Sequence, residues 1–153
     1  MYQKFKAPSG LINRQAKELV GIYRDAVKRL GISNSEFWIW YTLVATDGDH
    51  TQQDICSTWS LPKQTVNTII TRLRLKKHAY LEAVPGTRNH KVIRLTDAGR
   101  AYGESLILPI TQAENKAFER ISPEELDMAT RILDKYIETV QGELDAASKK
   151  GTH

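Results

Sequence analysis

The side chains best suited to binding a polar partner lie between Lys63 and Arg74, where they alternate with apolar residues at helical spacing. The apolar positions recur every three or four residues, as on the buried face of a helix: Val66, Ile69, Ile70 and Leu73. The other positions offer amides, hydroxyls and cations: Lys63, Gln64, Thr65, Asn67, Thr68, Thr71, Arg72 and Arg74. Amides can pair with adenine, Thr can contact a thymine methyl, and Lys or Arg can bind guanine or phosphate. This mixture suits a helix that reads base edges in a DNA groove.

Charge is distributed unevenly along the 153 residues. Between Ser60 and Arg100 there are nine basic and two acidic residues, whereas between Ser122 and Ala147 there are two basic and seven acidic ones. Such asymmetry indicates a polyanionic partner for the middle of the chain. The alternative is that solvated helix faces of opposite charge happen to lie in different parts of the sequence.

The middle of the chain also predicts the elements that position this helix. A short helix is expected over 52–59, because Thr51 can cap it with Asp54 three residues on. Pro62 suits the first turn of the next helix, expected over 62–77. Two short segments rich in β-branched residues, 80–85 and 90–96, flank the turn-forming "PGTRN" and predict a β-hairpin.

Longer helices are expected on both sides of this region. An apolar stripe over 9–30 predicts the first helix, which Gly31 ends. Ser33 and Glu36 form a capping-box pattern before a helix over 36–46 that is apolar nearly all round and should therefore be central. A helix is expected over 97–121, in which Gly99, Gly103 and Pro109 make the helical pattern less regular and Pro109 should introduce a kink. The cap "SPEE" starts the last helix, whose stripe covers 126–140.

The predicted fold class is therefore mainly α with one small β-hairpin. The order of the elements is that of a winged helix-turn-helix with N- and C-terminal dimerisation helices. At this point the residues resemble the MarR family of bacterial transcription regulators. The resemblance covers about 35–144 and is carried by "TQQDI", "LPKQTV", "VIRLTDAGR" and "ISPEEL". It implies a DNA-binding lobe over 35–96 and a dimerisation region made of 1–34 and 97–153.

The resemblance also implies a function. Members act as homodimers that bind a pseudo-palindromic DNA site and regulate transcription, here most simply as a repressor, often relieved by a small ligand or by oxidation. The alternative is a winged-helix module that binds another protein and does not bind DNA. The apolar stripes over 11–30 and 126–140 independently favour a dimer, because no further domain is present to cover them.

The wing departs from the commonest family pattern. An Asp-x-Arg triplet is frequent at the tip, whereas this sequence has Thr87-Arg88-Asn89, so that the aspartate is absent and the arginine stands one place earlier. Arg88 next to a turn glycine still suits a narrow minor groove, where the potential is most negative. We therefore expect Arg88 and Lys91 to contact DNA, and His90 to do so with less support.

Aromatic residues are concentrated in the central helix, at Phe37, Trp38, Trp40 and Tyr41. Core packing is the expectation for at least half of them. In the resembled family an effector pocket often lies where the dimerisation helices meet the DNA-binding lobe. Tyr23, Trp38 and Tyr41 are the candidates to line such a pocket, because pockets are apolar with a few polar groups.

Other functional classes have little support. Cys56 is the only cysteine, so no intramolecular disulfide can form, which fits a cytoplasmic location. Free cysteines are usually buried, so that Cys56 is expected to be a small buried residue. The four histidines lack metal-ligand spacing, so that no metal or other cofactor is expected. No nucleotide-binding or hydrolase motif is present, which argues against an enzyme. The N-terminal residues contain no apolar signal segment and no run is long enough to span a membrane, so that a membrane protein is not expected.

Overall fold

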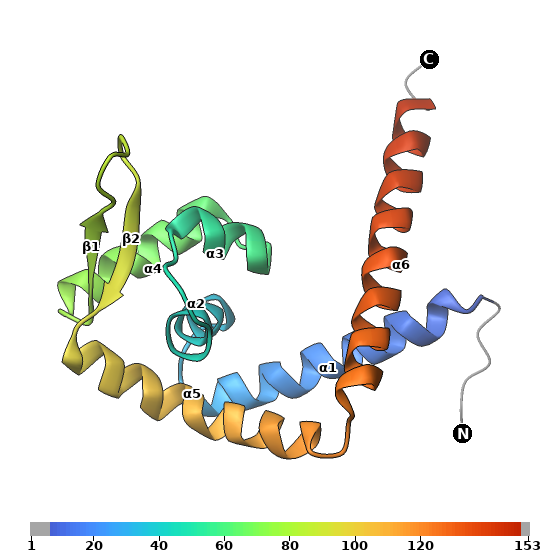
Figure 1. The fold of residues 1–153 in the computed structure, drawn as a ribbon, viewed down its shortest axis with the longest axis horizontal. Helices are drawn as coiled ribbons and strands as arrows, with labels where there is room; N and C mark the ends of the chain where they lie inside the picture. The colour runs from blue at the N-terminus through green and yellow to red at the C-terminus, as the bar shows by residue number, and fades with distance from the viewer. Residues whose placement is uncertain (1–6, 151–153) are drawn as a thin grey trace. The chain divides into compact units, whose positions relative to one another are not determined.

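The computed structural model describes residues 7–150 and confirms the predicted fold class (Figure 1). The elements follow one another in the predicted order: α1 (Ser9–Leu30), α2 (Asn34–Ala45), α3 (Gln52–Trp59), α4 (Lys63–Leu75), β1 (Ala79–Ala83), β2 (Lys91–Leu95), α5 (Asp97–Phe118) and α6 (Pro123–Lys150). The chain divides into two compact units whose boundary lies within α5, between Ile110 and Thr111. The division into a DNA-binding lobe and a dimerisation region stays a prediction.

Helix α2 forms the centre of the first unit, as its apolar composition predicts. Phe37, Ile39 and Trp40 are completely buried. In Figure 1, α2 is seen nearly end-on, with α3 and α4 on one side of it and α1 and the first half of α5 on the other. The two aromatic residues Phe37 and Trp40 are therefore core residues, and so is Cys56, which is buried on α3 as expected.

The first residues of three helices can be compared with the sequence interpretation: the cap of α3 is confirmed, and details at α2 and α4 are corrected. At α3, Thr51 and Asp54 form a full reciprocal capping box: the Asp54 N–H donates to Thr51 Oγ1 over 3.1 Å, and the Thr51 N–H donates to Asp54 Oδ2 over 2.8 Å. At α2, Ser33 Oγ accepts the Glu36 N–H, but the Glu36 carboxylate binds Arg72 of α4. Pro62 precedes α4 as its N-cap, with an extended ψ of 136°, and does not occupy the first turn.

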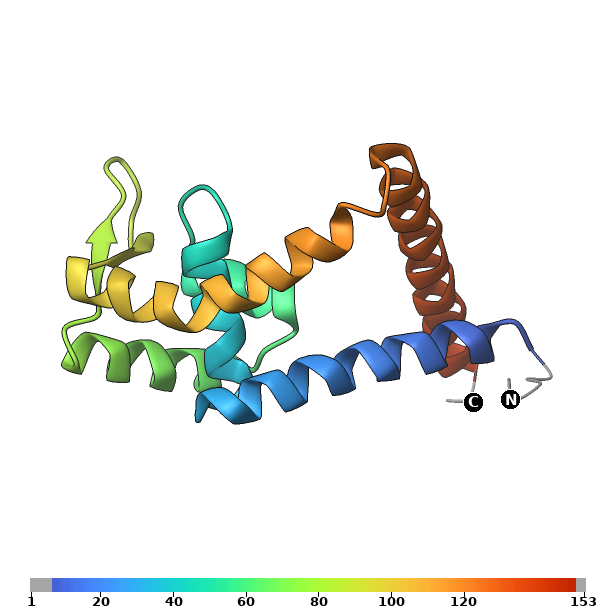
Figure 2. The same cartoon turned by 90° about the horizontal axis from the view of Figure 1, so that it is seen from below.

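The hairpin is antiparallel and pairs Ala79 with Leu95 and Ala83 with Lys91. Val92 and Ile93 of β2 are buried, and the Ile93 N–H donates to His50 O over 2.9 Å, which ties the hairpin to the loop before α3. Figure 2 shows the hairpin tip projecting beyond the helices of the first unit. The described elements 52–95 therefore have the arrangement of a winged helix-turn-helix.

Helix α5 continues without a break through Gly99, Gly103 and Pro109. The two glycines are buried where α5 approaches other parts of the first unit. A Cβ at Gly99 would lie 1.8 Å from the backbone oxygen of His78, and one at Gly103 would lie 2.6 Å from the Trp40 ring. These residues permit close packing, and they do not interrupt the helix.

Helix α6 belongs to the second unit and begins at the predicted cap. The Ser122 N–H donates to Glu125 Oε2 over 2.8 Å, and the Glu125 N–H donates to Ser122 Oγ over 3.2 Å. Its apolar side chains are exposed, at Leu126, Met128, Ile132, Leu133, Ile137 and Leu144. Among residues 7–150, no helix combines the length and the hydropathy that crossing a lipid bilayer requires.

Candidate nucleic-acid interface

Helix α4, the second helix of the helix-turn-helix and the candidate recognition helix, presents its predicted polar residues to solvent. Val66, Ile70 and Leu73 are at most 1% exposed and fix the helix against the core. The opposite side carries the exposed residues Lys63, Gln64, Asn67, Thr68, Thr71, Arg72 and Arg74, while Thr65 is half-buried. The helix therefore has the buried face and the polar outer face that insertion into a major groove about 12 Å wide requires.

An open cleft of about 520 Å³ lies between the starts of α3 and α4 and the hairpin. It brings together residues from three segments: Thr51, Gln52, Gln53, Lys63, Gln64, Asn67, Leu81, Asn89, His90 and Lys91. Lys63, Gln64, Asn67 and Lys91 are among the predicted contact residues. Gln52, Gln53 and Asn89 were not predicted, although "TQQDI" at a helix start contained the signal for the two glutamines.

The hairpin tip keeps a compact turn without the family's aspartate. Thr87 Oγ1 donates to Val84 O over 2.8 Å, and Asn89 adopts a left-handed φ of 66°. Asn tolerates this backbone region better than most residues. Arg88 is exposed, and within residues 7–150 it forms no ion pair. Its charge is exposed at the tip, and its contact with DNA stays a prediction.

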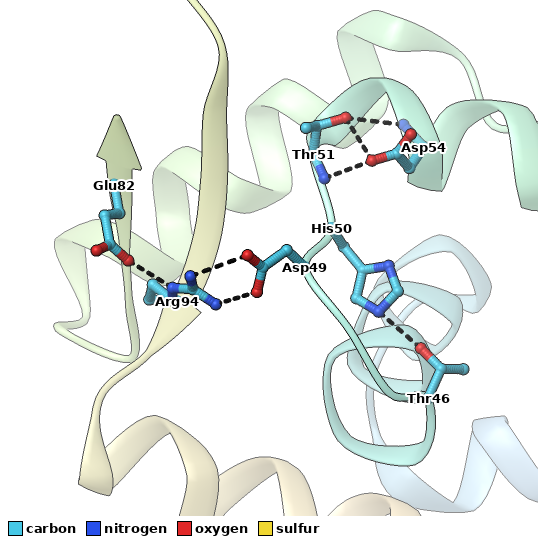
Figure 3. A network of polar contacts seen from close by, with 7 residues as sticks. All are labelled: Thr46, Asp49, His50, Thr51, Asp54, Glu82 and Arg94. Atoms are coloured by element: carbon cyan, nitrogen blue, oxygen red, sulfur yellow. Dashed lines mark hydrogen bonds and ion pairs between the residues drawn. The ribbon is translucent and has the colours of Figure 1, made fainter. Parts of the chain in front are cut away.

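The base of the hairpin is held by an ion-pair network that the sequence did not reveal (Figure 3). Arg94 of β2 binds Asp49 with two guanidinium nitrogens, one of them at 3.1 Å, and its Nε binds Glu82 of β1. The hydrogen bond from Arg94 lowers the pKa of Asp49, and the same contacts raise the pKa of Arg94. The pair of Arg94 and Asp49 is therefore charged at neutral pH, and this pair is lost as the pH falls through the lowered pKa of Asp49.

The loop that contains Asp49 lies between α2 and α3 and continues into α3. His50 Nε2 and Thr46 Oγ1 are 2.8 Å apart, and the capping box of Thr51 and Asp54 follows directly (Figure 3). Hydrogen bonds from Thr51 lower the pKa of Asp54, which keeps this cap ionised. Arg94 is paired with Asp49 and Glu82, so that it is not one of the free cations in the basic segment 60–100. Its role is to join the hairpin to the loop that starts α3.

Arg72 is also paired. Its guanidinium binds the carboxylate of Glu36 on α2, and the side chains are 47% and 10% exposed respectively. For the side chains of Lys63, Arg74 and Lys91, by contrast, no hydrogen bond or ion pair is found within the described residues 7–150. The cations of α4 thus differ: one is bound to the core and the others face solvent.

A second cleft, of about 190 Å³, lies between α1 and α2. Its lining contains Leu19, Val20, Tyr23, Asn34 and Trp38. Tyr23 and Trp38 of the predicted pocket are therefore adjacent, with ring centroids 5.5 Å apart, whereas Tyr41 contacts the Trp38 ring but does not line the cleft. The cleft is smaller than most sites for drug-sized molecules, and its size suits a single aromatic ring.

Trp38 also contacts the helix-turn-helix. Its ring stacks on Trp59 of α3 at a centroid distance of 4.2 Å and an interplanar angle of 19°. The Trp59 Nε1–H donates to Thr42 Oγ1 of α2 over 2.6 Å. The cleft between α1 and α2 is thus one side chain away from the short helix that precedes the recognition helix.

Known structures resemble this fold along nearly the whole chain. NMB1585, a MarR family regulator from Neisseria meningitidis, has 22% identity and a TM-score of 0.78, with 90% of this chain and 96% of that one covered. MepR from S. aureus, in its DNA-binding conformation, has 21% identity and a TM-score of 0.68, with 88% and 98% covered.

A third similar structure is BpsR from Bordetella bronchiseptica, whose DNA binding is regulated by 6-hydroxynicotinic acid. It has 20% identity and a TM-score of 0.59, with 89% of this chain and 96% of that one covered. No protein-family model and no curated protein matches the sequence. The structural likeness agrees with the resemblance seen in the sequence: the chain has the fold of the MarR family transcriptional regulators.

Proposed function

We propose that the protein is a MarR family transcriptional regulator that binds double-stranded DNA as a homodimer and acts as a repressor. The observation that carries this proposal is the polar outer face of α4 beside the cleft that contains Lys63, Gln64, Asn67 and Lys91. Amides and threonines there suit base edges, and the unpaired lysines suit phosphates. An exposed arginine at the hairpin tip suits the minor groove.

Salt dependence tests DNA binding directly. The affinity of the full chain for a random-sequence duplex should fall linearly on a log–log plot against salt, because each neutralised phosphate releases counterions. With six to ten phosphate contacts, the loss between about 50 and 200 mM salt is about 10³–10⁵-fold. If the protein bound no duplex at low salt, the alternative of a protein-binding winged helix would replace this proposal.

Base readout should be concentrated in α4. Asn67→Ala is expected to flatten discrimination at one base pair by about 1–3 kcal/mol, because an amide that pairs with a base edge is lost. Lys63→Ala should weaken all sequences alike and reduce the salt slope by about one. Selection of bound duplexes from a random pool, followed by fluorescence anisotropy at several salt concentrations, measures both. Uniform losses for both variants would contradict this division of roles.

We further propose that a small aromatic molecule binds the cleft between α1 and α2 and lowers DNA affinity. Tyr23 and Trp38 provide apolar surface, Asn34 provides a polar group, and the Trp38–Trp59 stack leads to α3. A ligand acts in this way if it prefers a conformation whose two recognition helices are not about 34–36 Å apart.

Trp38→Phe should weaken the effect of such a ligand more than it weakens DNA binding, since a smaller ring keeps contact with Trp59 but changes the lining of the cleft. Single-ring aromatic compounds are the probes, beginning with 6-hydroxynicotinic acid, and a typical coupling is about 1–3 kcal/mol. Tyr41→Phe is the control, because Tyr41 does not line the cleft. Equal ligand effects on wild type and Trp38→Phe would place the ligand elsewhere.

A further inference from the structure

Glu36 is the only charged residue that is buried in the described part of the chain, with 8% of its surface exposed. It lies in the first turn of α2, where its N–H is capped by Ser33, and its carboxylate reaches Arg72 in the last turn of α4. A buried carboxylate requires a partner, because removing one member of such a pair leaves an uncompensated charge. The pair therefore holds the C-terminal part of the recognition helix against α2.

The two members of the pair have very different access to DNA. Arg72 is half-exposed on α4 and by position alone could reach a phosphate, whereas Glu36 is too deeply buried to touch DNA. The planar guanidinium already directs one nitrogen at the Glu36 carboxylate. Its direction on the helix surface is thus fixed by the core, in contrast to that of Lys63 or Arg74.

We propose that Arg72 is a positioning residue, which together with Glu36 sets the orientation of the recognition helix on α2 and thereby the alignment of its base-reading residues. The inference rests on the proposed DNA-binding function. It assigns sequence discrimination in part to a buried carboxylate that contacts no nucleotide. It also gives Arg72 a role other than the guanine or phosphate contact that its residue type suggests.

The sign of the Glu36→Gln effect separates positioning from simple electrostatics. Neutralising a carboxylate near a DNA-binding face removes repulsion and should strengthen binding to any duplex. Positioning predicts the opposite for a specific duplex, because a neutral amide holds the guanidinium less strongly than a carboxylate does. Glu104→Gln is the matched control: it makes the same change in a half-exposed side chain, which pairs with Arg100 at 3.9 Å on α5.

Arg72→Lys provides a second, independent variant. It keeps the positive charge that a phosphate contact needs but loses the planar donor geometry that suits a carboxylate. The side chain is half-exposed, so this variant should fold even if Glu36→Gln does not. Thermal melting of each variant identifies a temperature at which all are folded, and DNA binding is compared there.

The experiment measures binding of the full chain to two duplexes: the tightest one selected from a random pool, and the random pool itself. Glu36→Gln and Arg72→Lys should each bind the selected duplex about tenfold less tightly, which corresponds to about 1.4 kcal/mol. Neither should bind the random pool less tightly than wild type, and neither should lower the salt slope, because no phosphate contact is removed. The ratio between the two affinities is the diagnostic quantity, since a loss of folded protein would lower both.

The double variant Glu36→Gln/Arg72→Gln completes a thermodynamic cycle. It should bind the selected duplex no more weakly than Arg72→Gln alone, because removing both partners leaves no unpaired buried charge. The inference is overturned if Glu36→Gln binds the selected duplex as tightly as wild type, or if Arg72→Lys does so. Failure of wild type to bind either duplex would instead reject the proposed function, and with it this role.

Discussion

Replacing Gly99 with alanine should lower the free energy of unfolding by at least about 3 kcal/mol, near the upper end of what overpacking costs. The added Cβ would lie 1.8 Å from the His78 oxygen and 2.6 Å from its carbonyl carbon, so that backbone rather than a flexible side chain must move. That oxygen also accepts the Thr96 N–H over 3.0 Å just before α5 begins. The clash therefore disrupts the junction of α4, the hairpin and α5 together.

Thermal and urea unfolding followed by circular dichroism measure the effect, which corresponds to a fall in Tm of about 6–12 °C for a chain of this size. Gly142→Ala is the control. It lies in α6, where a Cβ meets no atom within 4 Å, and it should be neutral or stabilise the helix by up to about 1 kcal/mol. If Gly99→Ala unfolded at the same temperature as wild type, the close approach of α5 to His78 would be wrong.

These glycines illustrate what the sequence could and could not predict. Composition and helix propensity make a glycine in a helix look like a weak point, and Gly99 and Gly103 were interpreted in that way. Their actual role depends on His78 and Trp40, which lie far from them along the sequence. Only the fold shows that the missing side chain is what allows contact.

The helix bounds, by contrast, were predictable because their signals are local. Gly31 ends α1 in a left-handed conformation with φ 71°, and Ser122 with Glu125 caps α6. Apolar spacing of three and four residues identified the buried face of α4, because that spacing follows directly from the helix period. For the same reason, the sequence predicted which residues lie on the outer face of α4. The helix period does not say what each of these residues binds.

Charged residues were the least predictable part of the candidate site. Glu36 matched a capping pattern with Ser33, yet its carboxylate pairs with Arg72, 36 residues away. Arg94 counted as one more cation of the basic segment, but Asp49 and Glu82 bind it. Net charge of a segment is a sum over residues, and it cannot distinguish a cation that faces solvent from one that is already paired within the fold.

Introducing a charge into the apolar stripe of α6 should convert the proposed dimer to monomers. Ile137 is 61% exposed and lies on the same side of the helix as Leu126, Leu133 and Leu144, which are 41%, 43% and 61% exposed. Exposed apolar surface of this extent on one helix side is typical of an interface between subunits. In Ile137→Glu, association would bury an unpaired carboxylate, which costs several kcal/mol.

We expect wild type to sediment as a dimer at micromolar concentration and Ile137→Glu to sediment as a folded monomer. DNA affinity should fall by at least about 100-fold, because a monomer loses the effective concentration that links the two half-sites. Lys135→Glu is the control: it also adds negative charge to α6, but on the polar side, away from the stripe. A folded wild-type monomer that binds the selected duplex tightly would reject the homodimer, and equal losses for both variants would show that net charge, not the stripe, is responsible.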